Sequence, residues 1–156
     1  MIKTNAIRLL SGAKIPFETV EYEVDENNLA GTEVAKKVGI PVEQVFKTLV
    51  AKGEKHGVCV FCIPAAKELD LKKAAKLVGE KKIEMLHVKD LLATTGYIRG
   101  GCSPIGMKKK FPTFMHESIL NYDMVAVSAG VRGCQVNLAP SDLVKFVGAK
   151  TADIIL

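Results

Sequence analysis

Residue types that mark specialised protein classes are scarce or absent in this chain of 156 residues. Its four cysteines are too few for a disulfide scaffold of this length, so we expect reduced thiols. No stretch approaches the roughly 18 consecutive apolar residues of a membrane span, and the first residues lack the apolar core of a signal peptide. No repeated unit and no low-complexity tract divides the chain. We therefore expect a cytoplasmic protein and no membrane partner.

The composition that is present is that of an ordinary globular domain, with 48% hydrophobic and 25% charged residues. We expect residues 1–156 to form a single domain, large enough for a core and one enclosed pocket. The formal net charge of +5 favours anionic partners without identifying one. The basic run Lys108–Lys110 has two interpretations, a surface that binds phosphates or a solvated face.

Apolar periodicity and turn residues predict an α+β fold. Alternation from Phe17 to Val24 indicates a half-buried strand, and Asp70 caps a helix that is expected to bury Leu71. Antiparallel hairpins are predicted for residues 46–51 with 58–63 and for residues 124–128 with 134–138. Helices are predicted over residues 4–12, 32–38, 71–78, 88–93 and 140–147. We expect a mixed, largely antiparallel sheet that is curled like a barrel and flanked by helices.

Cys59 and Cys62 have the spacing of a zinc or thioredoxin-type motif, but they lie in a predicted strand. Residues three apart on a strand face opposite sides, so these thiols are not placed to bind one metal ion. Cys102 and Cys134 are isolated, and the three histidines are scattered along the chain. We therefore expect structural thiols, without a metal site or a Ser-His pair.

Lys47 lies in an otherwise apolar predicted strand, on the same side as Leu49 and Ala51. One interpretation is structural, with the side chain reaching water near the end of the strand. The other is functional, with a fixed ammonium at the wall of a pocket that receives an anionic group or developing negative charge.

The segment Gly100–Gly106 is a glycine-rich loop without the spacing of a Walker or dinucleotide-binding motif. Its two adjacent glycines, Gly100 and Gly101, allow backbone amides to approach a ligand closely, where they can bind a carbonyl oxygen or a phosphate. A tight turn is the alternative interpretation. Ser128, at the end of a predicted strand, poses the same question.

Several ordered motifs carry a resemblance that runs nearly the length of the chain. They are Val45–Leu49, Leu69–Lys73, Thr95–Gly106 and Ser128–Gly133. With these motifs the chain resembles the YbaK/EbsC family of aminoacyl-tRNA deacylases, in particular its Cys-tRNA(Pro) deacylase branch. The resemblance implies a trans-editing enzyme that removes cysteine mischarged onto tRNA(Pro) by prolyl-tRNA synthetase. It implies neither a metal ion nor an organic cofactor.

The resemblance also implies roles for individual residues. The family's catalytic lysine falls on Lys47, and its glycine-rich loop falls on Gly100 and Gly101. Residues expected to contact the substrate are Tyr22, Thr48, Ser128 and Gln135. Some members carry Asp where this chain has Gln135, so a charged role is not transferred there, although an amide still forms hydrogen bonds. Others have an aromatic residue near Leu29 and Ala30, which bears on the substrate pocket.

The mechanism implied by the resemblance uses the thiol of the cysteinyl substrate. This thiol attacks the carbonyl carbon of the same cysteinyl group, so that a cyclic thiolactone forms and the tRNA is released. Two other functions stay open from the sequence. One is an Ala-tRNA(Pro) deacylase that uses water, and the other is a non-catalytic module that binds tRNA or a synthetase through Lys47.

Replacing both Cys102 and Cys134 with Ser should leave turnover largely intact, because in the mechanism that the resemblance implies the attacking thiol belongs to the substrate. The measurement is the rate at which cysteine is released from charged tRNA(Pro). A large loss of rate would show instead that a protein thiol is the nucleophile.

Overall fold

Both predicted hairpins form, and each belongs to a different sheet. β2 (Phe46–Gly53) pairs antiparallel with β3 (Gly57–Pro64), with Lys47 opposite Ile63. β6 (Val125–Ser128) pairs antiparallel with β7 (Cys134–Leu138), with Ser128 opposite Gln135. The structure is a computed structural model that describes residues 3–156.

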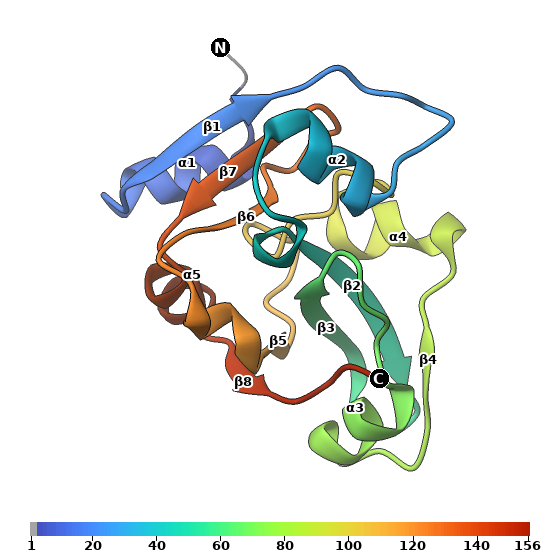
Figure 1. Ribbon diagram of the computed structural model, residues 1–156. Helices are drawn as coiled ribbons and strands as arrows, with labels where there is room; N and C mark the ends of the chain where they lie inside the picture. The colour runs from blue at the N-terminus through green and yellow to red at the C-terminus, as the bar shows by residue number, and fades with distance from the viewer. Residues whose placement is uncertain (1–2) are drawn as a thin grey trace.

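Further strands extend each hairpin into a sheet (Figure 1). β1 (Phe17–Glu21) completes a three-stranded sheet of order β1-β7-β6, while β4 (Ile83–Met85), β5 (Thr113–His116) and β8 (Lys150–Ala152) complete a five-stranded sheet of order β4-β2-β3-β5-β8. The β3/β5 and β5/β8 pairs are parallel, and the other pairs are antiparallel. This arrangement confirms the α+β class and the mixed, largely antiparallel pairing. The sheets do not close into a barrel, although Val45 bridges to Ala126 between them.

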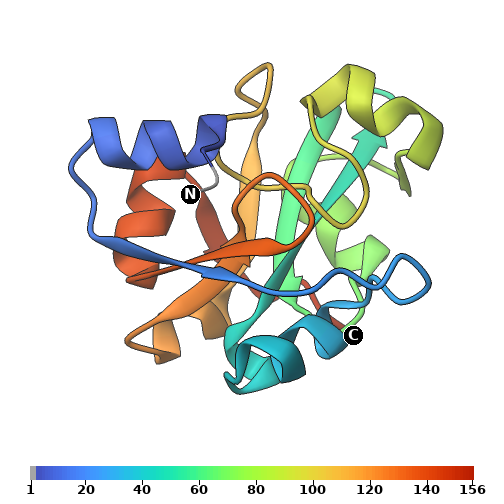
Figure 2. The same ribbon diagram turned by 90° about the horizontal axis from the view of Figure 1, so that it is seen from above.

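The helices lie around the outside of the two sheets (Figure 2). They are α1 (Asn5–Gly12), α2 (Gly31–Val38), α3 (Leu71–Val78), α4 (Val88–Thr95) and α5 (Pro140–Val147), with short 3₁₀ helices at Val42–Gln44 and Glu117–Asn121. Asp70 caps α3 as predicted, because its side chain accepts from the amides of Lys72 and Lys73. Within residues 3–156, no helix has the length and apolar character needed to cross a bilayer.

Three details differ from the sequence prediction. β1 ends at Glu21 instead of continuing to Val24. Leu71 is 41% exposed because it occupies the first position of α3, where the helix has not yet turned its apolar face to the sheet. β5 and β8 were not predicted: the residues of β5 are all buried and show no alternation, and β8 has only three residues.

The core divides between the two faces of the β2/β3 hairpin, as the strand period requires. Cys62 belongs to the cluster formed with α1, α5 and the three-stranded sheet, whereas Cys59 belongs to the cluster beneath α3. The prediction that these two thiols face opposite sides is therefore confirmed.

A buried histidine ties the C-terminal segment to the five-stranded sheet. His116, at the end of β5, accepts a hydrogen bond at Nδ1 from the amide of Ile154, and the same nitrogen lies 3.9 Å from the Asp153 carboxylate. Lys73 Nζ donates to Asp153 Oδ2 and to the Ile155 carbonyl, at 2.9 Å each. Burial lowers the pKa of His116, against the opposing effects of Asp153 and Glu117.

Protonation of His116 should destabilise the fold in mild acid. Because the folded pKa of His116 is lowered, the unfolded chain takes up the proton first as the pH falls. The contribution to stability is therefore complete above about pH 6.5, the unfolded value, and is lost as the pH falls from there through the lower folded pKa. In urea unfolding between about pH 7 and 5, His116→Asn, which keeps an acceptor but does not titrate, should flatten the fall in unfolding free energy. The matched control is His87→Asn, at an exposed histidine. Equal slopes in parent and His116→Asn would contradict this prediction.

Candidate active site

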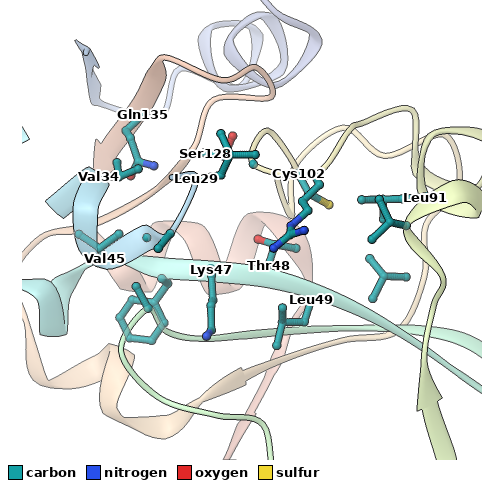
Figure 3. Close-up of a pocket in the computed structure, with 18 of the residues that line it drawn as sticks. Leu29, Val34, Val45, Lys47, Thr48, Leu49, Leu91, Cys102, Ser128 and Gln135 are labelled. Atoms are coloured by element: carbon teal, nitrogen blue, oxygen red, sulfur yellow. The ribbon is translucent and has the colours of Figure 1, made fainter. Parts of the chain in front are cut away.

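A pocket of about 580 Å³ lies along the first half of β2 (Figure 3). Its wall is formed by the loop before α2, β2 itself, the segment that leads into α4, the glycine-rich loop, and the facing ends of β6 and β7. The volume lies within the range of small-molecule sites, which is roughly 300–1,000 Å³. Five segments that are distant in sequence therefore meet around one cavity.

The pocket forms where β2 has an open edge. β3 covers one edge of β2 along its whole length, but β4 covers the other edge only at Ala51–Gly53. From Phe46 to Leu49 no strand pairs with this second edge, although β6 bridges to the chain at Val45, just before β2 begins. Side chains from both faces of β2 consequently border the same cavity, and main-chain groups at the open edge are available to a ligand.

Lys47 lines this pocket and is half-buried. Its ammonium forms no ion pair or hydrogen bond within residues 3–156. In Figure 3 the side chain leaves β2 on the opposite side from Thr48 and Cys102, with its nitrogen directed away from Ser128 and Gln135. The pocket wall thus contains a positive charge without a neutralising partner, which favours an anionic group nearby.

The thiols near the pocket are buried and protonated. Thr48 Oγ1 lies 3.6 Å from Cys62 Sγ, and burial raises the pKa of Cys62 to about 12. Burial likewise raises the pKa of Cys102, which lines the pocket, to about 11. Because the thiolate is the nucleophilic form of cysteine, Cys102 is a poor nucleophile at neutral pH.

Ser128 and Gln135 face each other across the β6/β7 pair and both line the pocket. Ser128 Oγ accepts from the amide of Gly130 at 3.1 Å. Gln135 is 7% exposed, and its Oε1 has no hydrogen-bond partner in the described part of the chain. A buried polar atom without a partner carries a desolvation cost, which a donor on a bound ligand would relieve.

The structure separates the two adjacent glycines of the loop. Gly100 lines the pocket, adopts a left-handed φ of 85°, and makes no intramolecular bond with its amide within residues 3–156. Gly101 is buried outside the pocket lining, and its amide donates to the Ile98 carbonyl at 2.9 Å. The geometry therefore leaves Gly100 as the amide of this pair that is free to meet a ligand.

Tyr22 borders the same pocket just beyond the end of β1, and its amide donates to the Gly133 carbonyl at 2.9 Å. All of the predicted site residues except Gly101 line the cavity. Arg99 also lines it and was not predicted, although it directly precedes Gly100 in the motif that carried the resemblance.

Comparisons with known proteins show which family this chain resembles. Residues 26–146 match the family model of the aminoacyl-tRNA editing domain. EbsC of Enterococcus faecalis, named as a candidate Cys-tRNA(Pro)/Cys-tRNA(Cys) deacylase, is 51% identical over 152 residues, which cover 97% of this chain and 93% of EbsC. A proline–tRNA ligase of Thermosipho africanus is 26% identical over 92 residues, 59% of this chain but 16% of the ligase.

A solved structure described as a candidate trans-editing enzyme for prolyl-tRNA synthetase has a TM-score of 0.84 at 28% identity, covering 100% of this chain and 99% of that one. The family model and the relative that matches nearly end to end identify the same activity class. This chain therefore belongs to the aminoacyl-tRNA editing domain family and is an aminoacyl-tRNA deacylase.

Proposed function

We propose that this enzyme removes cysteine from Cys-tRNA(Pro) in trans, and that prolyl-tRNA synthetase is its partner. The name of the relative EbsC supports cysteine as the amino acid. The similarity of part of the chain to proline–tRNA ligases supports tRNA(Pro) and its synthetase. Cys-tRNA(Cys) is a second substrate of the same chemistry. The enzyme needs neither a metal ion nor an organic cofactor for this reaction.

The observation that carries the proposal is the chemistry of the pocket wall. Among the residues that line it, the only cysteine is Cys102, whose thiol is protonated, and no histidine is present to activate a serine. The wall instead provides the Lys47 ammonium, the Gly100 amide and the amide group of Gln135. Such a wall binds and polarises a substrate, but it supplies no activated nucleophile.

In the mechanism that the family resemblance implies, the nucleophile is the substrate's own thiol. Its sulfur forms a bond to the carbonyl carbon, the bond from that carbon to the ribose oxygen breaks, and the thiol proton ends on the ribose hydroxyl. The products are a cyclic thiolactone and free tRNA. The attack is intramolecular because the thiol and the ester belong to one cysteinyl group, and the pocket contributes to the rate by holding that group in a reactive conformation.

The side chains around the pocket then have distinct roles. Lys47 favours the thiolate by placing a positive charge beside it, and the open edge of β2 leaves the flexible side chain free to turn towards the substrate. The Gly100 amide stabilises the oxyanion. Gln135 accepts from the substrate through its unpartnered Oε1, while Thr48, Ser128 and Tyr22 shape the remaining wall.

A deacylation assay with Cys, Ala and Pro on one tRNA(Pro), with and without prolyl-tRNA synthetase, tests the proposal. Cysteine should be released much faster than alanine or proline, because only cysteine carries the internal nucleophile. The synthetase should increase the rate by raising the local substrate concentration. Cysteine release no faster than in buffer would contradict the function, and faster alanine release would identify a water-using deacylase.

Lys47→Met should lower the rate of cysteine release by on the order of 100-fold, because Met keeps the length of the side chain and removes its charge. Lys52→Met is the matched control, since Lys52 lies on the same strand, is exposed and does not line the pocket. The measurement is single-turnover deacylation, with urea unfolding of each variant.

Parent-like activity in Lys47→Met would contradict a catalytic role for the ammonium. If tRNA binding is lost and the rate for bound substrate is unchanged, Lys47 binds a phosphate and does not act in the chemical step.

A further inference from the structure

Arg132 joins three segments on the outer side of the pocket wall. It lies in the turn between β6 and β7, and its Nε–H donates to the carbonyl of Arg99 at 2.8 Å. Its Nη1 donates to Glu26 Oε2, also at 2.8 Å. Arg132 is not among the residues that line the pocket, whereas Arg99 and Gly100 are. The guanidinium therefore holds the glycine-rich loop from behind.

The glycine-rich loop lies directly against this guanidinium. A Cβ atom at Gly100 would lie 3.2 Å from Arg132 Nε and 3.5 Å from Leu29 Cδ1. At Gly101 it would lie 3.1 Å from the backbone nitrogen of Arg132. The contacts of 3.1 and 3.2 Å are tight for a carbon atom, and Gly100 also has a left-handed φ of 85°, so the loop favours glycine at both positions.

The hydrogen bond to Arg99 determines where the Gly100 amide points. The Arg99 carbonyl and the Gly100 N–H belong to one peptide unit, which is trans and planar. In a trans peptide these two groups point in opposite directions. Since Arg132 holds the carbonyl on the outer side of the wall, the N–H of Gly100 is directed to the inner side. A donor at the carbonyl also polarises the amide and strengthens its N–H as a donor.

We propose that Arg132 is a positioning residue that directs the Gly100 N–H into the pocket and strengthens it as an oxyanion donor. This inference rests on the proposed function, because it assigns a task to the same site. Arg132 touches no reacting atom and acts through the peptide between Arg99 and Gly100.

Glu26 has the accompanying role of fixing the orientation of the guanidinium. Its side chain is 71% exposed, compared with 26% for that of Arg132, so the ion pair adds little to stability. The Glu26 carboxylate accepts a hydrogen bond from Nη1 of Arg132, while Nε of the same guanidinium donates to the Arg99 carbonyl in the loop. The planar guanidinium can make both hydrogen bonds at once. The single ammonium of a lysine does not reproduce this geometry.

The test compares Arg132→Met with the parent enzyme in deacylation of Cys-tRNA(Pro). Met keeps much of the apolar stem and removes both donors, so kcat should fall about tenfold to a hundredfold while KM changes little. Arg132→Lys should recover part of kcat through its one remaining donor. Arg8→Met is the matched control, because Arg8 lies on α1 and is exposed. That variant should keep parent activity.

A second measurement separates positioning from general stability. Residual dipolar couplings report the orientation of the Gly100 N–H vector, which should change in Arg132→Met and stay unchanged in Arg8→Met. An unchanged vector, or a rise in KM with kcat preserved, would overturn the inference. If Arg132→Met does not fold, kcat, KM and the orientation of the Gly100 N–H vector are measured on Arg132→Lys instead, and the same outcomes support or overturn the inference. If the parent is inactive, the proposed function fails, and the vector alone then decides whether Arg132 orients the amide.

Discussion

The absence of a paired strand on one edge of β2, from Phe46 to Leu49, is the constraint on which this site depends. A fully paired β2 would bury its main-chain groups in a ladder and leave no cavity there. Because β4 pairs only with Ala51–Gly53, the edge from Phe46 to Leu49 becomes the floor of the pocket. The glycine-rich loop and the facing strands β6 and β7 then form the walls above it. The candidate binding site therefore lies where one edge of β2 lacks strand pairing.

The walls around this floor are neutral or positive and contain no activated nucleophile. Burial keeps the Cys102 thiol protonated, and Lys47 has no carboxylate partner in the described part of the chain. An aminoacyl ester is already an activated electrophile, so a site that positions it and stabilises negative charge is sufficient when the substrate brings its own thiol. The electrostatics of the pocket and the chemistry of the proposed substrate are consistent with each other.

The two adjacent glycines of the glycine-rich loop use their backbone amides differently. The Gly101 amide is used inside the loop, in its bond to Ile98, and so gives the turn its shape. The Gly100 amide is left free beside the pocket. Arg132 supports this loop from outside through the Arg99 carbonyl. The same tight packing that favours glycine at both positions also gives the peptide a defined orientation, because a loosely held loop would let the amide rotate.

The sequence by itself determined the local elements and the family. Alternation, capping residues such as Asp70 and glycine stops act within a few positions, so both hairpins and the five α-helices of residues 3–156 were predicted close to their observed bounds. The ordered motifs also contain Lys47, Gly100 and Ser128 as candidate site residues, and these line one pocket. Only the tertiary structure decided that β5 and β8 form, that β2 has an open edge, and that Gly101 turns away from the pocket. It alone brought Arg132 against a loop 33 positions away. Strand pairing and the contacts that hold a loop in place involve residues that are distant along the chain, so local periodicity in the sequence does not specify them.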